Sequence, residues 1–261
     1  MNLVLSAAVG YNWKQLEIFI KSLRRFYYDK VVLILNSPSS ELIKKLNEFS
    51  VEFINTDVEP QETYQYRYRC YAEFLKSNKK YNKVLLTDSR DVFFQNNPFS
   101  FKYVNNLNFF LEDELIQNSS WNIKIIKRTV GNKNLKILLK QRISNGGVII
   151  GNFLDIFNYC NLMNENIRIY KFKPSLHSRI FSRSIKGWDQ GIHIFLVYNN
   201  FLKDYGFYDN SNGNVATLRL NKKIKIKNNK FVNDLGVEYS IVHQYDHLIS
   251  EFPEFFKNLI L

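Results

Sequence analysis

The stretch that decides the fold of this 261-residue chain is YNKVLLTDSRDVFF, residues 81–94. Residues 84–87 form a short run without polar alternation, which is typical of a strand buried on both faces of a parallel sheet. The run leads directly into Asp88 and Asp91. Because ligands of open α/β sheets bind beyond the carboxyl ends of the strands, these two acids lie where a ligand is expected.

Two interpretations of this acid pair are open. Carboxylates a few ångströms apart repel each other unless they share a cation. A hard divalent ion, which accepts carboxylate and phosphate oxygens, would remove that repulsion. The alternative is an exposed turn in which Asp88 caps a neighbouring backbone group and Arg90 pairs with Asp91.

Before this stretch, apolar runs alternate with amphipathic helical patterns. The predicted strands are 2–9, 31–35 and 51–54, and the predicted helices have apolar positions within 16–23, 42–49 and 64–75. Asn12 is expected to cap the first helix. This β-α-β-α-β order predicts a Rossmann-like α/β fold with right-handed crossovers and a mostly parallel sheet flanked by helices.

After Pro98 the pattern is less regular. Two glycines at 146 and 147 precede an apolar run, which indicates backbone that approaches either a ligand or a neighbouring strand closely. Asp189 is placed to act as the N-cap of a helix. The other expected elements are strands at 109–111, 215–220, 223–227 and 239–243, helices at 135–139 and 153–163, and a terminal helix.

Composition and charge limit the class of protein. Apolar residues at 45% and charged residues at 23% are ordinary globular values, and the length suits a single domain. Cys70 and Cys160 are isolated thiols, and residues 3–9 are too short for a signal peptide or a bilayer span, so we expect a cytoplasmic protein. The net charge of +12 suits an anionic partner: nucleic acid, a membrane surface or a phosphate-bearing substrate.

The positive charge looks dispersed along the chain. Its densest cluster, residues 222–227, alternates as an edge strand does, and lysines on such a strand prevent pairing between sheets. A solvated edge is therefore the first interpretation and approach to a membrane the second. A dinucleotide-binding G-x-G-x-x-G after the first strand, a P-loop and a G-x-S-x-G serine elbow are all absent from the sequence.

Several segments together resemble the GT-A-fold glycosyltransferases. They are Arg67-x-x-x-Tyr71-x-x-Phe74-Leu75, residues 83–92 with their D-x-R-D block, Asn145-Gly146-Gly147-Val148, Trp188-Asp189-Gln190-Gly191, and residues 242–246. The chain is most similar to nucleotide-diphospho-sugar transferases with a D-x-R-D acid block, and more distantly to glycogenin-like enzymes. The resemblance covers most of the chain, and the set of blocks in this order is more specific than any one block.

That resemblance implies a UDP or GDP sugar donor, a Mn²⁺ or Mg²⁺ ion, and transfer to a hydroxyl of a glycan or glycolipid in surface polysaccharide synthesis. Residues 1–100 would bind the nucleotide and residues 101–261 the acceptor, within one domain. Asp91 would ligate the metal, His243 would complete its shell, and Asp88 would hold the ion through water or hold the ribose. Asp189 and Gln190 would be the catalytic pair. The donor-binding residues would be Ala8, Val9, Gly10, Tyr11, Arg67, Asp88, Ser89, Arg90, Asn145, Gly146 and Gly147.

One departure from the family pattern concerns the acids. The usual D-x-D places both carboxylates on one side of an extended chain, because the strand period is two. Here the spacing is D-x-x-D, so either the backbone turns after Asp88 or Ser89 is the partner of Asp91. Asp91 is a ligand in both registers.

A second class of function is also open. A non-catalytic protein could use the same scaffold to bind anionic glycan, a membrane surface or nucleic acid. Nucleic acid is the least favoured of these partners, because the one interleaved run of aromatic and basic residues, 66–69, lies in a predicted helix. Peripheral contact with the inner face of a membrane remains an expectation.

Overall fold

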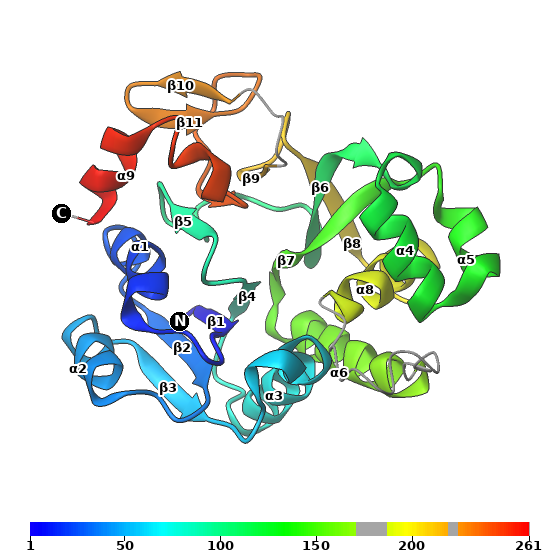
Figure 1. Cartoon of the computed structure of the whole chain (residues 1–261), viewed down its shortest axis with the longest axis horizontal. Coiled ribbons are helices and arrows are strands. Elements are labelled where there is room, and N and C mark those ends of the chain that lie inside the picture. The colour runs from blue at the N-terminus through cyan, green and yellow to red at the C-terminus, as the bar shows by residue number, and fades with distance from the viewer. Residues whose placement is uncertain (171–186, 219–223, 261) are drawn as a thin grey trace.

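A computed structural model describes residues 1–170, 187–218 and 224–260 of the chain (Figure 1). Within these ranges the main sheet has seven strands, in the order β3-β2-β1-β4-β7-β6-β8. The strands are β1 (Leu3–Ala7), β2 (Lys30–Leu35), β3 (Glu52–Asn55), β4 (Lys83–Thr87), β6 (Leu107–Leu115), β7 (Arg142–Asn152) and β8 (Tyr205–Asp209). β7 alone runs antiparallel to its neighbours. The fold is therefore α/β with a mixed sheet, compatible with a Rossmann-like arrangement.

Helices cover both faces of this sheet (Figure 1). The described helices are α1 (Trp13–Arg24), α2 (Ser40–Glu48), α3 (Thr63–Ser77), α4 (Ser120–Thr129), α5 (Gly131–Leu138), α6 (Phe153–Ile169), α8 (Trp188–Tyr198) and, over the C-terminal sheets, α9 (Pro253–Ile260). Alternate residues of β1 enter different cores: Leu3 and Leu5 pack with α3, α6 and α8, whereas Val4 packs with α1 and α2. The period of two in a strand thus explains why residues 3–5 are apolar on both faces.

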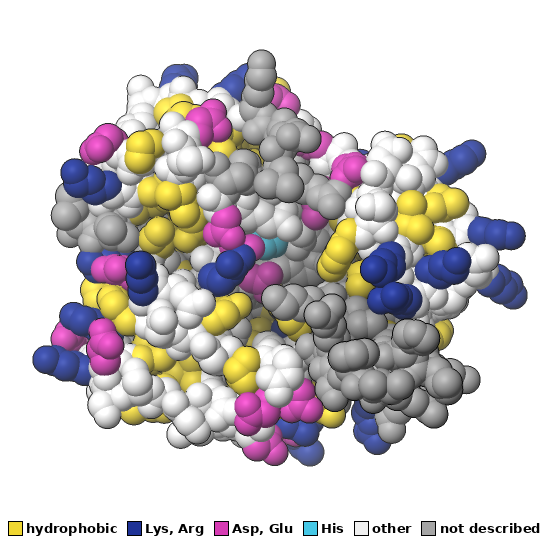
Figure 2. Space-filling model, viewed as in Figure 1, with side chains coloured by type: hydrophobic (Ala, Val, Ile, Leu, Met, Phe, Trp, Pro, Cys, Tyr) yellow, Lys and Arg dark blue, Asp and Glu magenta, His cyan; other side chains and the backbone are white. Residues whose placement is uncertain are grey.

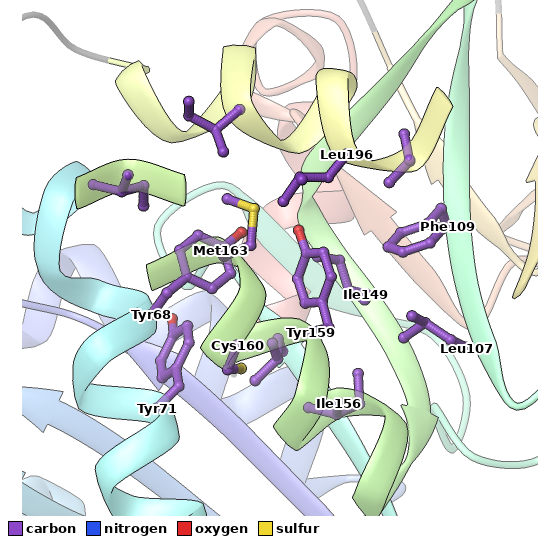
Figure 3. Packing of buried hydrophobic residues seen from close by; sticks show 14 of the residues in the cluster. Tyr68, Tyr71, Leu107, Phe109, Ile149, Ile156, Tyr159, Cys160, Met163 and Leu196 are labelled. Carbon is purple, nitrogen blue, oxygen red and sulfur yellow. The ribbon is translucent and has the colours of Figure 1, made fainter. Parts of the chain in front are cut away.

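The core beneath α3, α6 and α8 is rich in tyrosine. Figure 3 shows Tyr68 and Tyr71 of α3 packed beside Tyr159 and Met163 of α6. The Tyr68 ring meets Tyr71 and Tyr159 edge to face, with centroids 5.8 and 5.7 Å apart. Because a buried phenol needs a hydrogen-bond partner, Tyr71 accepts the backbone N–H of Ala7 at 2.9 Å and so fixes α3 against the carboxyl end of β1.

The first helices begin where the sequence predicts. Asn12 accepts from the backbone of Gln15 at 3.1 Å while the Gln15 side chain accepts from the Asn12 backbone, which is a capping box. Ser39 caps α2 in the simpler way. The predicted elements between residues 2 and 87 are all present.

The order of the strands creates a crevice at one edge of the sheet. From β1 the chain steps outward through β2 to β3, and then α3 carries it back across to β4 on the other side of β1. The direction of winding changes between β1 and β4. Ligands of doubly wound sheets bind outside the carboxyl ends of the strands at such a point.

The C-terminal part adds two small sheets and a third apolar cluster. β5 (Val92–Phe94) pairs antiparallel with β12 (Ile241–His243), which pairs parallel with β9 (Val215–Thr217). β10 (Lys225–Lys227) and β11 (Lys230–Val232) form a two-stranded ribbon. α9 packs over this region through Phe256 and Leu259. The predicted strands 215–220 and 223–227 are present in part, and residues 219–223 lie outside the described ranges.

Three short 3-10 turns complete the described elements: Pro60–Glu62, Ile116–Asn118 and Asp246–Leu248. Cys70 and Cys160 are free thiols. Among the described residues, the helices are all too short or too polar to cross a bilayer.

A buried histidine joins three elements of the core. His193 of α8 lies 2.9 Å from the Ser144 hydroxyl of β7 through Nε2, and 2.7 Å from the Tyr159 hydroxyl of α6 through Nδ1. Burial, and after it the positive charge of Arg67, lowers its pKa to about 3. His193 is therefore neutral in the folded protein at every pH at which the fold is expected to persist.

This pKa predicts a loss of stability in acid. Below pH 6.5 the unfolded chain takes up a proton on His193 and the folded chain does not, so the free energy of unfolding falls by about 1.4 kcal/mol per pH unit from this residue. We expect the wild type to lose about 2 kcal/mol more than His193→Gln between pH 7.5 and pH 5, measured by urea unfolding. Equal losses in the two proteins would contradict the depressed pKa, since all other titrating groups are common to both.

Candidate active site

A cavity of about 320 Å³ opens at the carboxyl end of β4, beside the point where the winding changes. In Figure 2 carboxylate side chains and a histidine meet near the middle of the molecule's face. The described residues that line the cavity are Tyr64, Arg67, Asp88, Asp91, Glu112, Trp121, Asn122, Asn145, Gly147, Gly187, Asp189, Gln190, His243 and Gln244. Most of the residues expected from the sequence are therefore in one place.

Asp88, Asp91 and His243 form the centre of this cavity. One ligand atom from each lies within 4.8 Å of the other two. His243 Nε2 is 3.6 Å from Asp88 Oδ2 and 4.0 Å from Asp91 Oδ1. His243 is buried and the two aspartates are half-buried. The three side chains are close enough to hold one ion.

The backbone around the acids explains their position. The Asp88 N–H donates to the Gly147 carbonyl at 2.7 Å, which extends the pairing of β4 with β7 by one bond. The chain then turns, and β5 begins directly after Asp91. Ser89 is buried and is not among the described residues that line the cavity, whereas Asp88 and Asp91 both line it, so the geometry favours Asp88 over Ser89 as the partner of Asp91.

β12 supplies the histidine. It pairs with β5 so that His243 stands opposite Val92, the residue after Asp91. The next residue, Gln244, has a φ of +63° and donates its N–H to the Asp91 carbonyl at 2.8 Å. A left-handed turn thus ends β12 at the site and fixes the imidazole over the acids.

Gly147 leaves the space that the three ligands need. A Cβ at this position would lie 2.4 Å from His243 Cε1 and 2.7 Å from Asp88 Oδ2. Neither neighbour is a flexible chain end that could move aside. The backbone at Gly147 therefore lies close to its neighbours, as the two glycines at 146 and 147 predicted. The missing side chain is part of the cradle.

The pKa shifts of the three residues are those expected of a site that binds a cation. Burial alone would raise the pKa of Asp88, but Arg67 and His243 outweigh it and the pKa is lowered. Burial and the Asp88 charge raise the pKa of Asp91. Burial opposes the charge of His243, yet the nearby carboxylates of Asp88 and Asp91 raise its pKa. A proton on the imidazole therefore offsets the two acids, and a metal ion could replace it.

The donor set fits a divalent metal. Two carboxylate oxygens and an imidazole nitrogen suit Mn²⁺, and less closely Mg²⁺, which prefers oxygen ligands. Ligand atoms about 2.1 Å from one ion lie about 3 Å apart when adjacent and about 4 Å apart when opposite. His243 Nε2 lies 3.6 Å from Asp88 Oδ2 and 4.0 Å from Asp91 Oδ1, which is close to these separations. The cradle at Gly147 gives the ion room.

Arg67 connects the acids to the opposite wall. Its Nη1 lies 2.6 Å from Asp88 Oδ1, and its Nη2 lies 2.6 Å from Asp189 Oδ2. Burial opposes the charge of Arg67, but Asp189 and Asp88 raise its pKa well above the ordinary value, so it is a cation. Burial also raises the pKa of Asp189, against the effect of Arg67.

Asp189 and Gln190 both line the cavity, but Asp189 does not cap its helix. The N-cap of α8 is Gly187, with a φ of +80°, and Asp189 follows in the first turn, so the capping interpretation of Asp189 is wrong. Gln190 accepts the Gly146 N–H at 2.9 Å and donates to the Ser144 carbonyl at 2.7 Å. Both hydrogen bonds of the Gln190 amide are thus made with the backbone of β7, and they fix the part of the strand on which Gly147 lies.

The remaining predicted residues lie around the rim. Asn145 donates to Glu112 Oε1 at 2.8 Å and accepts the Gly147 N–H at 2.7 Å. Arg90 pairs with Asp246 at 2.8 Å. The described contacts include no ion pair between Arg90 and Asp91, which was part of the alternative interpretation of the acid pair.

The loop after β1 reaches the same cavity edge. Burial, and after it the Asp88 charge, raises the pKa of Tyr11 to about 12. Ala8 and Val9 are buried, and Gly10 has a φ of +78° with a Cβ position 2.5 Å from Pro60. Gly10 is thus required by packing and by backbone conformation.

Sequence reasoning missed several lining residues. Tyr64 lies one turn before Arg67 on α3, and Glu112 stands in β6 where a strand end was expected. Trp121, Asn122 and Gln244 line the cavity from α4 and from the turn after β12. The helical spacing of Tyr64 and Arg67 could have identified the first; the others depend on contacts between distant segments.

Comparisons of the chain with protein-family models and with curated proteins find no match. The case for a function therefore depends on the geometry of this site.

The first prediction for the site is metal binding. We expect one Mn²⁺ per chain at pH 8, and Asp91→Asn should weaken it at least about tenfold, because loss of even an outer partner of a metal ligand has that effect. Titration by electron paramagnetic resonance measures both affinities. Binding should weaken at pH 6, where a proton on His243 competes with the ion.

The matched control is Asp57→Asn, which changes the same charge at a side chain that is 90% exposed. It should bind Mn²⁺ as the wild type does. Undiminished binding by Asp91→Asn would show that the ion lies elsewhere.

The second prediction concerns the Arg67 bridge. Arg67→Met leaves Asp189 buried without its cation, so it should lower the free energy of unfolding by about 3–5 kcal/mol. Arg69→Met, on the same helix and paired with an exposed acid, should lower it by less than about 1 kcal/mol. Adding Asp189→Asn to Arg67→Met should restore at least about 1 kcal/mol. Guanidinium unfolding gives all three values, and similar losses for the two arginine variants would refute the bridge.

Proposed function

We propose that this protein is a metal-dependent glycosyltransferase of the GT-A type. It transfers a sugar from a nucleotide-diphosphate donor, with UDP-sugars favoured, to a hydroxyl of a glycan or glycolipid acceptor. The observation that carries the proposal is the set Asp88, Asp91 and His243 at the carboxyl end of β4. It lines one cavity with the ion pair of Arg67 and Asp189.

The two acids and the histidine would hold Mn²⁺ or Mg²⁺. The ion would bind the donor diphosphate and act as a Lewis acid on the charge that develops as the sugar leaves. Without it the cavity repels a diphosphate, since Asp88, Asp91, Glu112 and Asp189 all line it. This balance explains why donor binding should require the metal.

The nucleoside would lie at the β1 side of the cavity. Tyr11 follows β1, and Tyr64 lines the cavity from α3. Burial, then Asp189 and Asp88, raises the pKa of Tyr64 as it does for Tyr11, so both phenols are neutral. Neutral aromatic rings beside a diphosphate site suit the stacking of a base.

The sugar would lie toward Asp189 and the backbone of β7. Arg67 Nη2 lies 2.6 Å from Asp189 Oδ2, and the same guanidinium places a fixed positive charge beside Asp88. That charge would stabilise the leaving diphosphate, because preorganised charges in a partly dry site act more strongly than in water. Asp189 would accept hydrogen bonds from the sugar or acceptor hydroxyls, and Gln190 would keep the β7 backbone in place.

A thermal-shift measurement tests the proposal. UDP or GDP at about 100 times its dissociation constant should add ~2.7 kcal/mol of stability when Mn²⁺ is present, and almost none without it. Asp91→Asn should abolish the gain because the diphosphate then lacks its ion, and Asp57→Asn should keep it. A panel of nucleotide sugars, followed by release of the nucleotide diphosphate, identifies the donor.

Two outcomes would overturn the proposal. The first is nucleotide binding that is equally strong in Asp91→Asn or in the presence of a chelator. The second is metal-dependent donor binding with no sugar released from any donor, which would leave a binding protein without catalysis. A response to DNA alone would instead support the non-catalytic class of function.

A further inference from the structure

Within the described ranges, α4 and α5 carry a long basic segment without acidic residues. Residues 115–154 contain seven Lys or Arg and no Asp or Glu. Arg142 pairs with Asp113 and Asp209. The other six are exposed and have no ion pair within the described ranges: Lys124, Lys127, Arg128, Lys133, Lys136 and Lys140. Figure 2 shows Lys and Arg side chains gathered over α4 and α5, beside a hydrophobic patch.

These six cations, together with Trp121 and Ile137, form what we call the basic face. Trp121 is 43% exposed and Ile137 is 61% exposed, both large values for apolar side chains. The opposite sides of the helices are fixed in the core through Ile126 and Leu138. The amphipathic pattern therefore holds the cations and the two apolar side chains outward.

The basic face reaches the rim of the active-site cavity. Trp121 lines that cavity. A Cβ at Gly187 would lie 2.4 Å from the Trp121 ring, so the indole packs directly against the Gly187 backbone. Gly187 is also the N-cap of the helix that carries Asp189. A surface bound to α4 and α5 would thus lie beside the mouth of the cavity.

We propose that the basic face binds the surface of an anionic phospholipid bilayer. Five of the six cations are lysines, which attract anionic headgroups as point charges. An exposed tryptophan and isoleucine among them suit the interface between headgroups and acyl chains. Nucleic acid is the weaker fit, because it is bound chiefly by arginine forks and by stacked aromatic rings in a groove.

This proposal does not depend on the transferase activity. Vesicle binding requires neither metal nor nucleotide, so each proposal can fail alone. If both hold, an acceptor hydroxyl carried on a lipid would be presented at the cavity rim; this consequence rests on the proposed function.

Co-sedimentation of the full chain with vesicles tests the basic face. We expect binding to vesicles of phosphatidylcholine with 30 mol% phosphatidylglycerol in about 0.1 M NaCl, and release in about 0.5 M NaCl as the charges are screened. The fourfold variant Lys124→Gln, Lys127→Gln, Lys133→Gln and Lys136→Gln should bind at least about 25-fold more weakly. Each lysine near an anionic bilayer contributes about fivefold, and losing two contacts is enough.

The control carries the same change of charge on the other half of the molecule. Lys14→Gln, Lys44→Gln, Lys76→Gln and Lys79→Gln replace four exposed lysines near α1, α2 and α3. This variant should stay within about threefold of the wild type, because surface charges more than a Debye length from the bilayer contribute little. Equal losses in the two variants would show that net charge alone drives binding and would overturn the proposal.

A single apolar change gives an independent readout. Ile137→Ser should weaken vesicle binding about fivefold without changing its dependence on salt, since it removes apolar contact only. Binding to pure phosphatidylcholine as strong as to the charged vesicles would also overturn the proposal. So would tighter binding to a short DNA duplex than to vesicles, which would assign the face to a soluble polyanion.

Discussion

The repulsion between Asp88 and Asp91 is the constraint on which the rest of the site depends. Both carboxylates are half-buried, and each is within reach of the same histidine. Left alone they would raise one another's pKa and give up their charge. The fold prevents this for Asp88 with a guanidinium on one side and an imidazole on the other. The position of these two cationic groups is therefore as much a part of the site as the acids.

Each compensating group comes from a different part of the chain. Arg67 belongs to α3, whose register is fixed by the bond from Ala7 to Tyr71. His243 follows the acids by more than 150 residues in the sequence. The antiparallel pairing of β12 with β5 places it beside Asp91. β7 is the one reversed strand among the described strands of the main sheet, and its Gly147 leaves space for the ligands. The C-terminal sheets are thus required for the site, although they add little to the main sheet.

Much of the first half could be predicted from the sequence, because its signals are local. The buried run before Asp88, the Asn12 capping box and the alternation of strands and helices each depend on residues close together in the chain. Elements such as β5 and β8 were missed because three apolar residues, or five of mixed polarity, are too few to carry a periodic signal. They are strands because of the strands with which they pair. Asp189 was expected at a helix cap for a related reason. An aspartate that caps a helix and one that forms a buried ion pair cannot be told apart in the sequence. The contact between Arg67 and Asp189, which is made in the folded chain, distinguishes them.

The placement of charge was the least predictable feature. The lysines near residue 225 form an evident cluster in the sequence because they alternate with apolar residues. The helices α4 and α5 carry more cations on one surface, but helical spacing separates these cations along the sequence. The net charge of +12 is therefore unevenly distributed between two neighbouring regions, the cavity and the basic face. Among the residues that the structure describes, four acidic side chains and one arginine line the cavity, and the surface at its rim is basic. An anionic bilayer at the basic face would be attracted by the rim and repelled by the cavity, so the acids that could hold a metal ion would also keep lipid phosphates out of the cavity.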